Sequence, residues 1–135
     1  MSVGILLITH GNIGKVLLDT AIEVLGVCPL PAHALSAPAD CQPDTVLAEA
    51  EAALLQLDEG QGVLVLTDLY GSTPSNIACK LHGRDGIRVV SGINLPMLIR
   101  ALNYPQLDLD ELLVKAVSGG RDGVLICQNE GNHAG

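Results

Sequence analysis

Residues 5–14 read Ile5-Leu6-Leu7-Ile8-Thr9-His10-Gly11-Asn12-Ile13-Gly14, and this stretch decides the fold. The apolar run shows no polar alternation, which is typical of a strand buried on both faces of a parallel sheet. It ends at Thr9-His10-Gly11, and a helical pattern follows directly. Such a strand delivers His10 to its carboxyl end, beside a helix N-terminus, where a phosphate can be held. We therefore take His10 as the candidate functional residue.

The composition predicts one α/β domain. Of the 135 residues, 48% are hydrophobic and only 1% aromatic, so the core is built from Val, Leu, Ile and Ala. The net charge of −8 argues against a nucleic-acid surface, and no apolar run is long enough to span a membrane. The N-terminus lacks the cationic segment of a signal peptide. We expect a cytoplasmic protein with reduced thiols at Cys28, Cys41, Cys79 and Cys127.

Strands and helices alternate along the chain. Apolar runs predict strands over Val3–Thr9, Ala32–Ser36, Val63–Thr67 and Ile87–Val90, with a short last strand over Val124–Cys127. Apolar spacing predicts four helices, over Lys15–Leu25, Pro43–Leu57, Pro74–Leu81 and from Pro96 to Pro105. Gly26 is the expected C-cap of the first, and Thr73 is the expected N-cap of the third. A fifth helix is expected to begin at the capping pair Asp108 and Glu111, to run through Val117 and to stop at Gly119-Gly120. This alternation predicts a doubly wound, mainly parallel sheet in the order 2-1-3-4, flanked by helices.

In that strand order, the first and third strands flank the topological switch point, where ligands bind at the carboxyl ends. These two ends carry His10 and Asp68. A carboxylate that accepts a hydrogen bond from one ring nitrogen fixes the tautomer of a histidine and stabilises the charge it develops as a nucleophile. The alternative is that Asp68 caps the loop after its strand and that His10 is an ordinary turn residue.

The segment Gly71-Ser72-Thr73-Pro74 is a candidate phosphate loop. It offers two hydroxyls, a flexible backbone and a helix N-terminus, although the same pattern is typical of an ordinary N-cap. The remaining histidines at 33, 82 and 133 have no metal-site spacing, and we expect them to be structural or solvated.

Three segments together resemble the IIA component of the mannose/fructose-type family of the bacterial sugar phosphotransferase system (PTS). They are Ile8–Gly11, Thr67–Asn76 and Ser91–Leu98, and the resemblance extends from Val3 to Ile126. His10 matches the phosphorylated histidine of the family, Asp68 its orienting aspartate, and Thr73 the hydroxyl before the proline. The chain departs from the family at Ser72, where a second glycine is usual, and at Tyr70, where Trp is common.

The resemblance implies a phosphotransferase that carries a phosphoryl group on His10 and needs no cofactor or metal. The small phosphocarrier HPr would donate, a IIB domain would accept, and a membrane permease would be involved only indirectly. The phosphate loop would comprise Gly11, Gly71, Ser72 and Thr73. A IIA-type domain would span 1–127, with a polar tail over 128–135. The resemblance also implies a homodimer in which Val124–Cys127 is exchanged as an antiparallel strand.

Four apolar residues form a docking rim around His10 or simply belong to the core: Ile13, Tyr70, Leu95 and Met97. Three other functions fit the same histidine. A small tetrapyrrole chelatase of the sirohydrochlorin type would use His10 to bind a metal, with only His82 as a second histidine. A histidine phosphatase would have Arg where Thr9 stands. A regulatory module would sense phosphorylation of His10 and bind a partner.

Overall fold

The computed structural model of the chain describes residues 2–128. A parallel sheet in the order β2-β1-β3-β4 lies between helices, which confirms the predicted fold class and strand order. The strands are β1 (Gly4–His10), β2 (Ala32–Ala37), β3 (Val63–Thr67) and β4 (Ile87–Ser91). The helices are α1 (Ile13–Leu25), α2 (Pro43–Leu57), α3 (Thr73–Cys79), α4 (Leu95–Leu102) and α5 (Leu109–Asp122).

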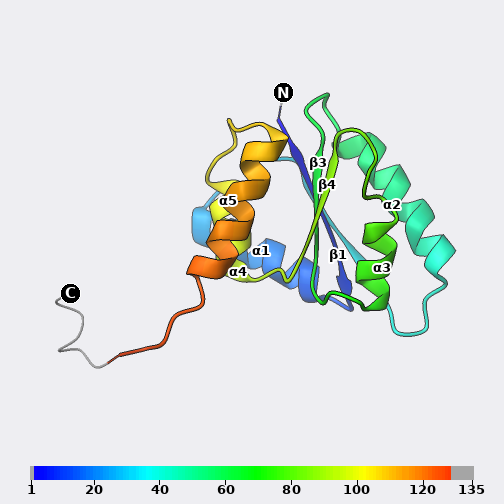
Figure 1. Cartoon of the computed structure of the whole chain (residues 1–135), viewed down its shortest axis with the longest axis horizontal. Helices are drawn as coiled ribbons and strands as arrows, with labels where there is room; N and C mark the ends of the chain where they lie inside the picture. The colour runs from blue at the N-terminus through cyan, green and yellow to red at the C-terminus, as the bar shows by residue number, and fades with distance from the viewer. Residues whose placement is uncertain (1, 129–135) are drawn as a thin grey trace.

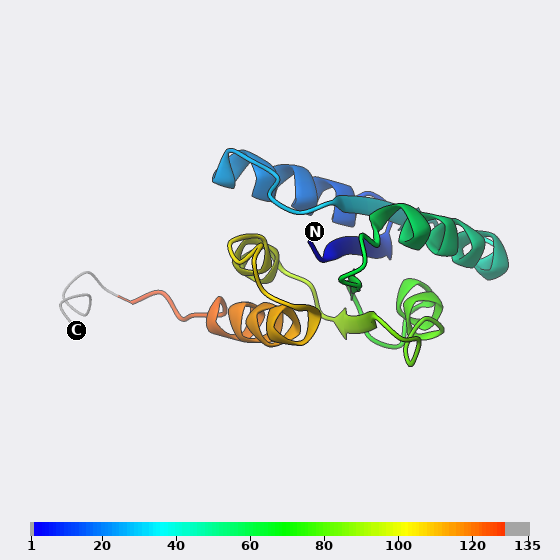
Figure 2. The same ribbon diagram turned by 90° about the horizontal axis from the view of Figure 1, so that it is seen from above.

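The sheet separates two layers of helices. Figure 1 shows α1, α4 and α5 on one face and α2 and α3 on the other, and Figure 2 shows the same arrangement from above. Alternate side chains of a strand face opposite ways, so Leu7 and Leu66 pack in one core while Leu6 and Val65 pack in the other. This is the physical reason that β1 and β3 lack polar alternation.

The strand register brings two chain segments together at one edge of the sheet. In the parallel pair β1–β3, Ile8 lies opposite Thr67, and both strands end within two residues of that pair. The residues that follow, His10 on β1 and Asp68 after β3, therefore leave the sheet side by side.

Helix α5 is longer than predicted. We expected it to stop at Gly119-Gly120, but it continues to Asp122. A Cβ atom at Gly119 would lie 2.7 Å from the Cβ of Arg100, and one at Gly120 would lie 2.8 Å from the Cε of Met97. The two glycines therefore permit the close packing of α5 against α4 rather than ending the helix.

The helix ends show smaller differences and two confirmed caps. Helix α1 begins at Ile13 instead of Lys15, and the N-cap of α3 is Ser72 instead of Thr73. Gly26 closes α1 in the left-handed conformation at φ 78°, as its position predicted. Asp108 and Glu111 form the predicted capping box. None of the helices within residues 2–128 is long and apolar enough to cross a membrane.

The segment Val124–Cys127 forms no strand within the single chain, and its predicted exchange with a partner chain stays a prediction. Figures 1 and 2 both show it projecting from the end of α5, away from the body of the molecule. Its apolar side chains are exposed: 75% at Val124, 82% at Leu125 and 87% at Ile126. A strand needs a hydrogen-bonding neighbour, and residues 2–128 of the single chain supply none here. The predicted tail beyond Gln128, with His133, lies outside the described residues.

Candidate functional site

His10 and Asp68 form a direct pair at the carboxyl edge of the sheet. The Nδ1 atom of the His10 ring lies 2.7 Å from Oδ2 of Asp68. The backbone N–H of His10 donates to the same oxygen at 3.1 Å. The Asp68 side chain is 12% exposed, whereas that of His10 is 44% exposed. One ring nitrogen is thus held inside the protein while the rest of the ring is open to solvent.

The charge on Asp68 determines the tautomer of this ring. Burial raises the pKa of the Asp68 carboxyl, but the hydrogen bonds from the ring and the backbone of His10 outweigh it, so the pKa lies below its usual value. Asp68 is therefore ionised near neutral pH, and an ionised carboxylate only accepts hydrogen bonds. Nδ1 of the neutral ring must carry the proton. The lone pair is left on Nε2, on the side of the ring away from the carboxylate.

Asp68 also ties the loop that follows it, so the two roles weighed for this residue coexist. Its second oxygen, Oδ1, accepts from the backbone N–H of Leu69 at 3.0 Å. The carboxylate thus joins the end of β1 to Leu69, two residues before the candidate phosphate loop begins at Gly71.

Thr9 is a site residue that the sequence reasoning did not single out. Its hydroxyl accepts from the backbone N–H of Gly14 at 2.8 Å and lies 3.3 Å from the carbonyl oxygen of His10. A Cβ atom at Gly14 would lie 3.0 Å from this hydroxyl, so the absence of a side chain at Gly14 favours the close approach of α1. The hydroxyl fixes the turn that leads from His10 into α1. A threonine five residues before a glycine carries no sequence signal by itself.

Local hydrogen bonds and a glycine conformation shape the candidate phosphate loop. Ser72 donates to the carbonyl oxygen of Leu69 through both its hydroxyl and its backbone N–H. Gly71 adopts φ 86°, a left-handed conformation that favours glycine. The backbone N–H groups of Gly71 and Thr73 have no backbone acceptor within the described part of the chain. Gly71 and Thr73 are exposed, as is Gly11, which follows His10.

The four candidate rim residues divide between surface and core. Ile13 is 46% exposed and Tyr70 is 80% exposed, and each lies within three residues of a member of the histidine–aspartate pair. Met97 is a core residue, 4% exposed, so the core alternative holds for it. Leu95 is partly buried against the same core. Val16 and Leu69, at 59% and 62% exposed, add to the apolar surface.

The other histidines do not join the site. His33 is exposed on the edge strand β2, and His82 is exposed in the turns after α3. Among residues 2–128, no group of three or more His, Cys, Asp or Glu side chains could hold a metal ion. The four cysteines are all free thiols.

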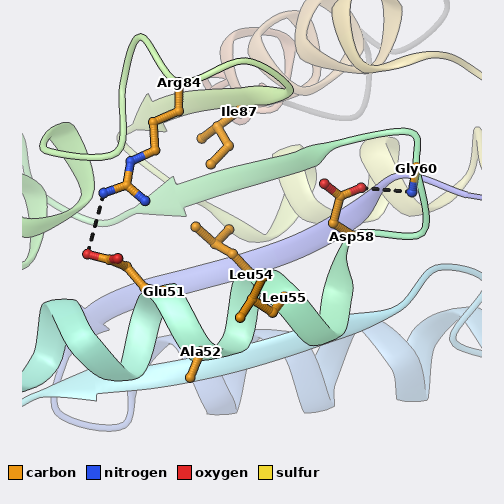
Figure 3. Close-up of a pocket in the computed structure, with 8 residues that line it drawn as sticks. All are labelled: Glu51, Ala52, Leu54, Leu55, Asp58, Gly60, Arg84 and Ile87. Carbon is orange, nitrogen blue, oxygen red and sulfur yellow. Dashed lines mark hydrogen bonds and ion pairs between the residues drawn. The ribbon is translucent and has the colours of Figure 1, made fainter.

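A groove of about 750 Å³ lies at the opposite edge of the sheet, near the amino ends of β3 and β4. Figure 3 shows Arg84 and Glu51 pointing toward each other across it, with their charged atoms 3.4 Å apart. The groove is lined by Glu51, Ala52, Leu54, Leu55, Asp58, Gly60, Arg84 and Ile87. These residues include no nucleophile comparable to His10, which lies at the carboxyl end of the strands.

Comparison with known structures defines the class of protein to which this fold belongs. The chain superposes on the mannose/sorbose-specific IIA subunit of the phosphotransferase system from Enterococcus faecalis with a TM-score of 0.85. The two are 29% identical, and the match covers 96% of this chain and 97% of that one. The phosphotransferase system component EIIA from Streptococcus agalactiae gives a TM-score of 0.79 at 25% identity, covering 92% and 96% of the two chains. The fold is that of a PTS IIA component.

The family follows from the sequence comparisons. The model of the family described as "PTS system fructose IIA component" matches residues 4–117, and the chain belongs to this mannose/fructose-type IIA family. It is 34% identical over 127 residues to the mannose-specific EIIAB component of Escherichia coli K12, a match covering 92% of this chain and 39% of that protein. The chain thus spans well under half the length of this relative. The comparisons give the chelatase alternative no support.

Proposed function

We propose that this protein is a phosphoryl carrier of a sugar phosphotransferase system, and that His10 is the phosphorylated residue. HPr donates the group, and a IIB domain accepts it. The observation that carries the proposal is the 2.7 Å contact between Nδ1 of His10 and the Asp68 carboxylate, in a ring that is 44% exposed. This arrangement supports Nε2 as the attacking atom, because Nδ1 is held and protonated.

The transfer is a displacement at phosphorus. The lone pair on Nε2 of His10 attacks the phosphorus of phosphorylated HPr, and the bond from phosphorus to the donor's nitrogen breaks as the new bond forms. The electron pair of the broken bond leaves with the donor imidazole. The His10 ring then carries a positive charge with the proton still on Nδ1, and the carboxylate of Asp68 stabilises that charge. Passing the group to a IIB domain is the same step in reverse.

Backbone N–H groups are the candidates for holding the new negative charge. The phosphoryl group adds about −1.5 to −2 charges near neutral pH. The exposed backbone at Gly11, Gly71 and Thr73, together with the Thr73 hydroxyl, can donate to its oxygens. Ser72 has both of its donors engaged within the loop, so we assign it the role of shaping the loop.

The exposed apolar residues near the pair form the proposed docking surface for the carrier partners: Ile13, Val16, Leu69 and Tyr70. HPr and IIB must both bring a phosphoryl-bearing side chain to Nε2 of His10, so both must cover this surface in turn. Because the proposed partners are cytoplasmic, we propose that this protein is cytoplasmic too.

We further propose a homodimer in which each chain adds Val124–Cys127 to the sheet of its partner. The segment projects from the chain and is apolar and exposed, and β4 is an edge strand of the sheet. Removing residues 123–135 should give monomers or aggregates in light scattering, whereas the full chain is a dimer. A truncated protein that remains a stable dimer would contradict the exchange.

A regulatory role is a second candidate function. The chain is 32% identical over 113 residues to the transcriptional regulatory protein LevR of Bacillus subtilis, covering 79% of this chain and 12% of LevR. Transfer from the phosphorylated protein to purified IIB distinguishes the two roles. Fast transfer supports sugar uptake, and a stable phosphorylated form that IIB does not discharge supports regulation.

The test of the carrier function is labelling with phosphoenolpyruvate, enzyme I and HPr. The protein should gain one phosphoryl group per chain, and His10→Ala should gain none. His33→Ala is the matched control, because this histidine is exposed on the edge strand β2, and it should be labelled like the wild type. Labelling that persists in His10→Ala, or a wild type that accepts no phosphoryl group, would contradict the proposal.

A further inference from the structure

Two serine hydroxyls contact each other next to the candidate phosphate loop, one of them in the first turn of α3. Ser75 is the third residue of α3 and is completely buried. Its Oγ atom lies 3.3 Å from Oγ of Ser91, the last residue of β4. Hydroxyls near a helix start commonly bond to their own backbone, but this contact crosses from the helix to the sheet. It ties the first turn of α3 to the carboxyl end of β4.

The same end of β4 is joined to the strand that carries Asp68. Ser91 lies opposite Thr67 in the parallel pair β3–β4, and Thr67 directly precedes Asp68. The carbonyl oxygen of Thr67 accepts from the backbone N–H groups of Gly92 and Ile93, at 2.9 and 3.1 Å. The residue before Asp68 and the residue that contacts α3 are therefore neighbours at the carboxyl ends of β3 and β4.

The loop between Asp68 and α3 is consequently fixed at both ends. At its start, Oδ1 of Asp68 accepts from the backbone N–H of Leu69. At its end, Ser75 is bonded to Ser91, two residues after Thr73. Gly71 and Thr73, whose N–H groups are candidates for the phosphoryl oxygens, lie between these two anchors.

We infer that Ser75 and Ser91 are positioning residues for phosphoryl transfer, which set the place of the Gly71–Thr73 loop relative to His10. This inference rests on the proposed carrier function. We assign neither hydroxyl to the reacting atoms, because Ser75 is completely buried and its hydroxyl contact is with Ser91 of β4. Loss of the contact lets the first turn of α3 shift, and small displacements of groups that stabilise a transition state slow the reaction markedly.

The test is rapid-quench measurement of transfer from phosphorylated HPr to Ser75→Ala, Ser91→Ala and the double variant. Each single variant should lower kcat by about 3- to 10-fold, the effect of one neutral hydrogen bond. The KM for phosphorylated HPr should stay within about twofold, because neither residue lies on the docking surface. The double variant should be no slower than the slower single variant, since both remove one contact. Ser91→Thr, which keeps the hydroxyl, should restore kcat.

The matched control is Ser118→Ala, which removes a hydroxyl bonded to the carbonyl oxygen of Lys115 on α5. It should transfer at the wild-type rate. The inference is overturned if Ser75→Ala and Ser91→Ala both keep the wild-type kcat, or if Ser118→Ala loses as much. Ser91 is only partly buried, so Ser91→Ala decides the matter if Ser75→Ala does not fold. A wild type that accepts no phosphoryl group refutes the carrier function itself, which separates the two failures.

Discussion

Replacing Asp68 tests how the His10 ring is prepared for transfer. The Asp68 carboxylate receives three N–H donors: Nδ1 of His10 at 2.7 Å, the His10 backbone at 3.1 Å and the Leu69 backbone at 3.0 Å. Asp68→Ala removes the charge-assisted bond to the ring, which contributes about 1.5–3 kcal/mol. Because about 1.4 kcal/mol corresponds to tenfold in rate, transfer to His10 should slow by about 10- to 150-fold.

Asp68→Asn should be at least as damaging, although it keeps the shape of the side chain. If the amide oxygen faces His10, the NH₂ group faces the N–H of Leu69, and two donors collide. If the NH₂ group faces His10, it collides with the backbone N–H and donates to Nδ1, which moves the ring proton to Nε2. Either orientation disturbs the nucleophile, so we expect a loss at or beyond the upper end of the range for alanine, about 150-fold or more.

The assay is single-turnover transfer from radiolabelled phospho-HPr, followed by rapid quench. Asp110→Asn is the matched control, because Asp110 is an exposed aspartate paired with Arg88 at 3.0 Å, far along the chain from His10. It should transfer at the wild-type rate. Thermal melts establish that each variant is folded. A folded Asp68→Asn protein that transfers within about threefold of the wild type would refute the assignment of Asp68 as the group that holds the ring.

Three further predictions concern stability. The pKa of Asp68 is lowered in the folded protein. Its ionised form therefore stabilises the fold at pH values above its unfolded pKa of about 3.9. This contribution is lost as the pH falls through the folded pKa. In urea unfolding, the stability difference between wild type and Asp68→Asn should therefore shrink as the pH falls below about 3.9, and a difference that grows over this acid range would contradict the sign. Thr67→Val should raise the free energy of unfolding by about 1 kcal/mol, since the buried Thr67 hydroxyl has no hydrogen-bond partner within residues 2–128. A free energy of unfolding below that of the wild type would disprove this. Gly119→Ala should cost about 1–2 kcal/mol, because the added Cβ would lie 2.7 Å from the Cβ of Arg100. Val114→Ala, at an exposed position of the same helix, serves as the control and should change little.

The sequence predicted the parts of the fold that depend on local patterns. Uninterrupted apolar runs such as residues 5–8 identified the buried strands, and the order of strands and helices led to the confirmed sheet order. The pairing of His10 with Asp68 followed from that order, because parallel strands that are neighbours deliver their ends to one edge. The geometry agrees with this expectation.

The features that the sequence did not reveal all depend on contacts between distant segments. Gly119 and Gly120 read as a helix stop, but their small size serves the packing of α5 against α4. The sequence left open whether Met97 is a surface or a core residue, because the sequence around a single apolar residue does not show whether its side chain is buried. The Ser75–Ser91 contact joins residues sixteen positions apart on different elements, so no spacing rule points to it.

The most direct test of the central claim is the position of the phosphoryl group on the ring. The protein, labelled with ¹⁵N in its histidines, is phosphorylated with phosphoenolpyruvate, enzyme I and HPr, and the ring nitrogens are assigned by NMR through their coupling to phosphorus. We predict one phosphoryl group, on Nε2 of His10, with the proton retained on Nδ1 beside Asp68. A phosphoryl group on Nδ1, or on any residue other than His10, would contradict the account.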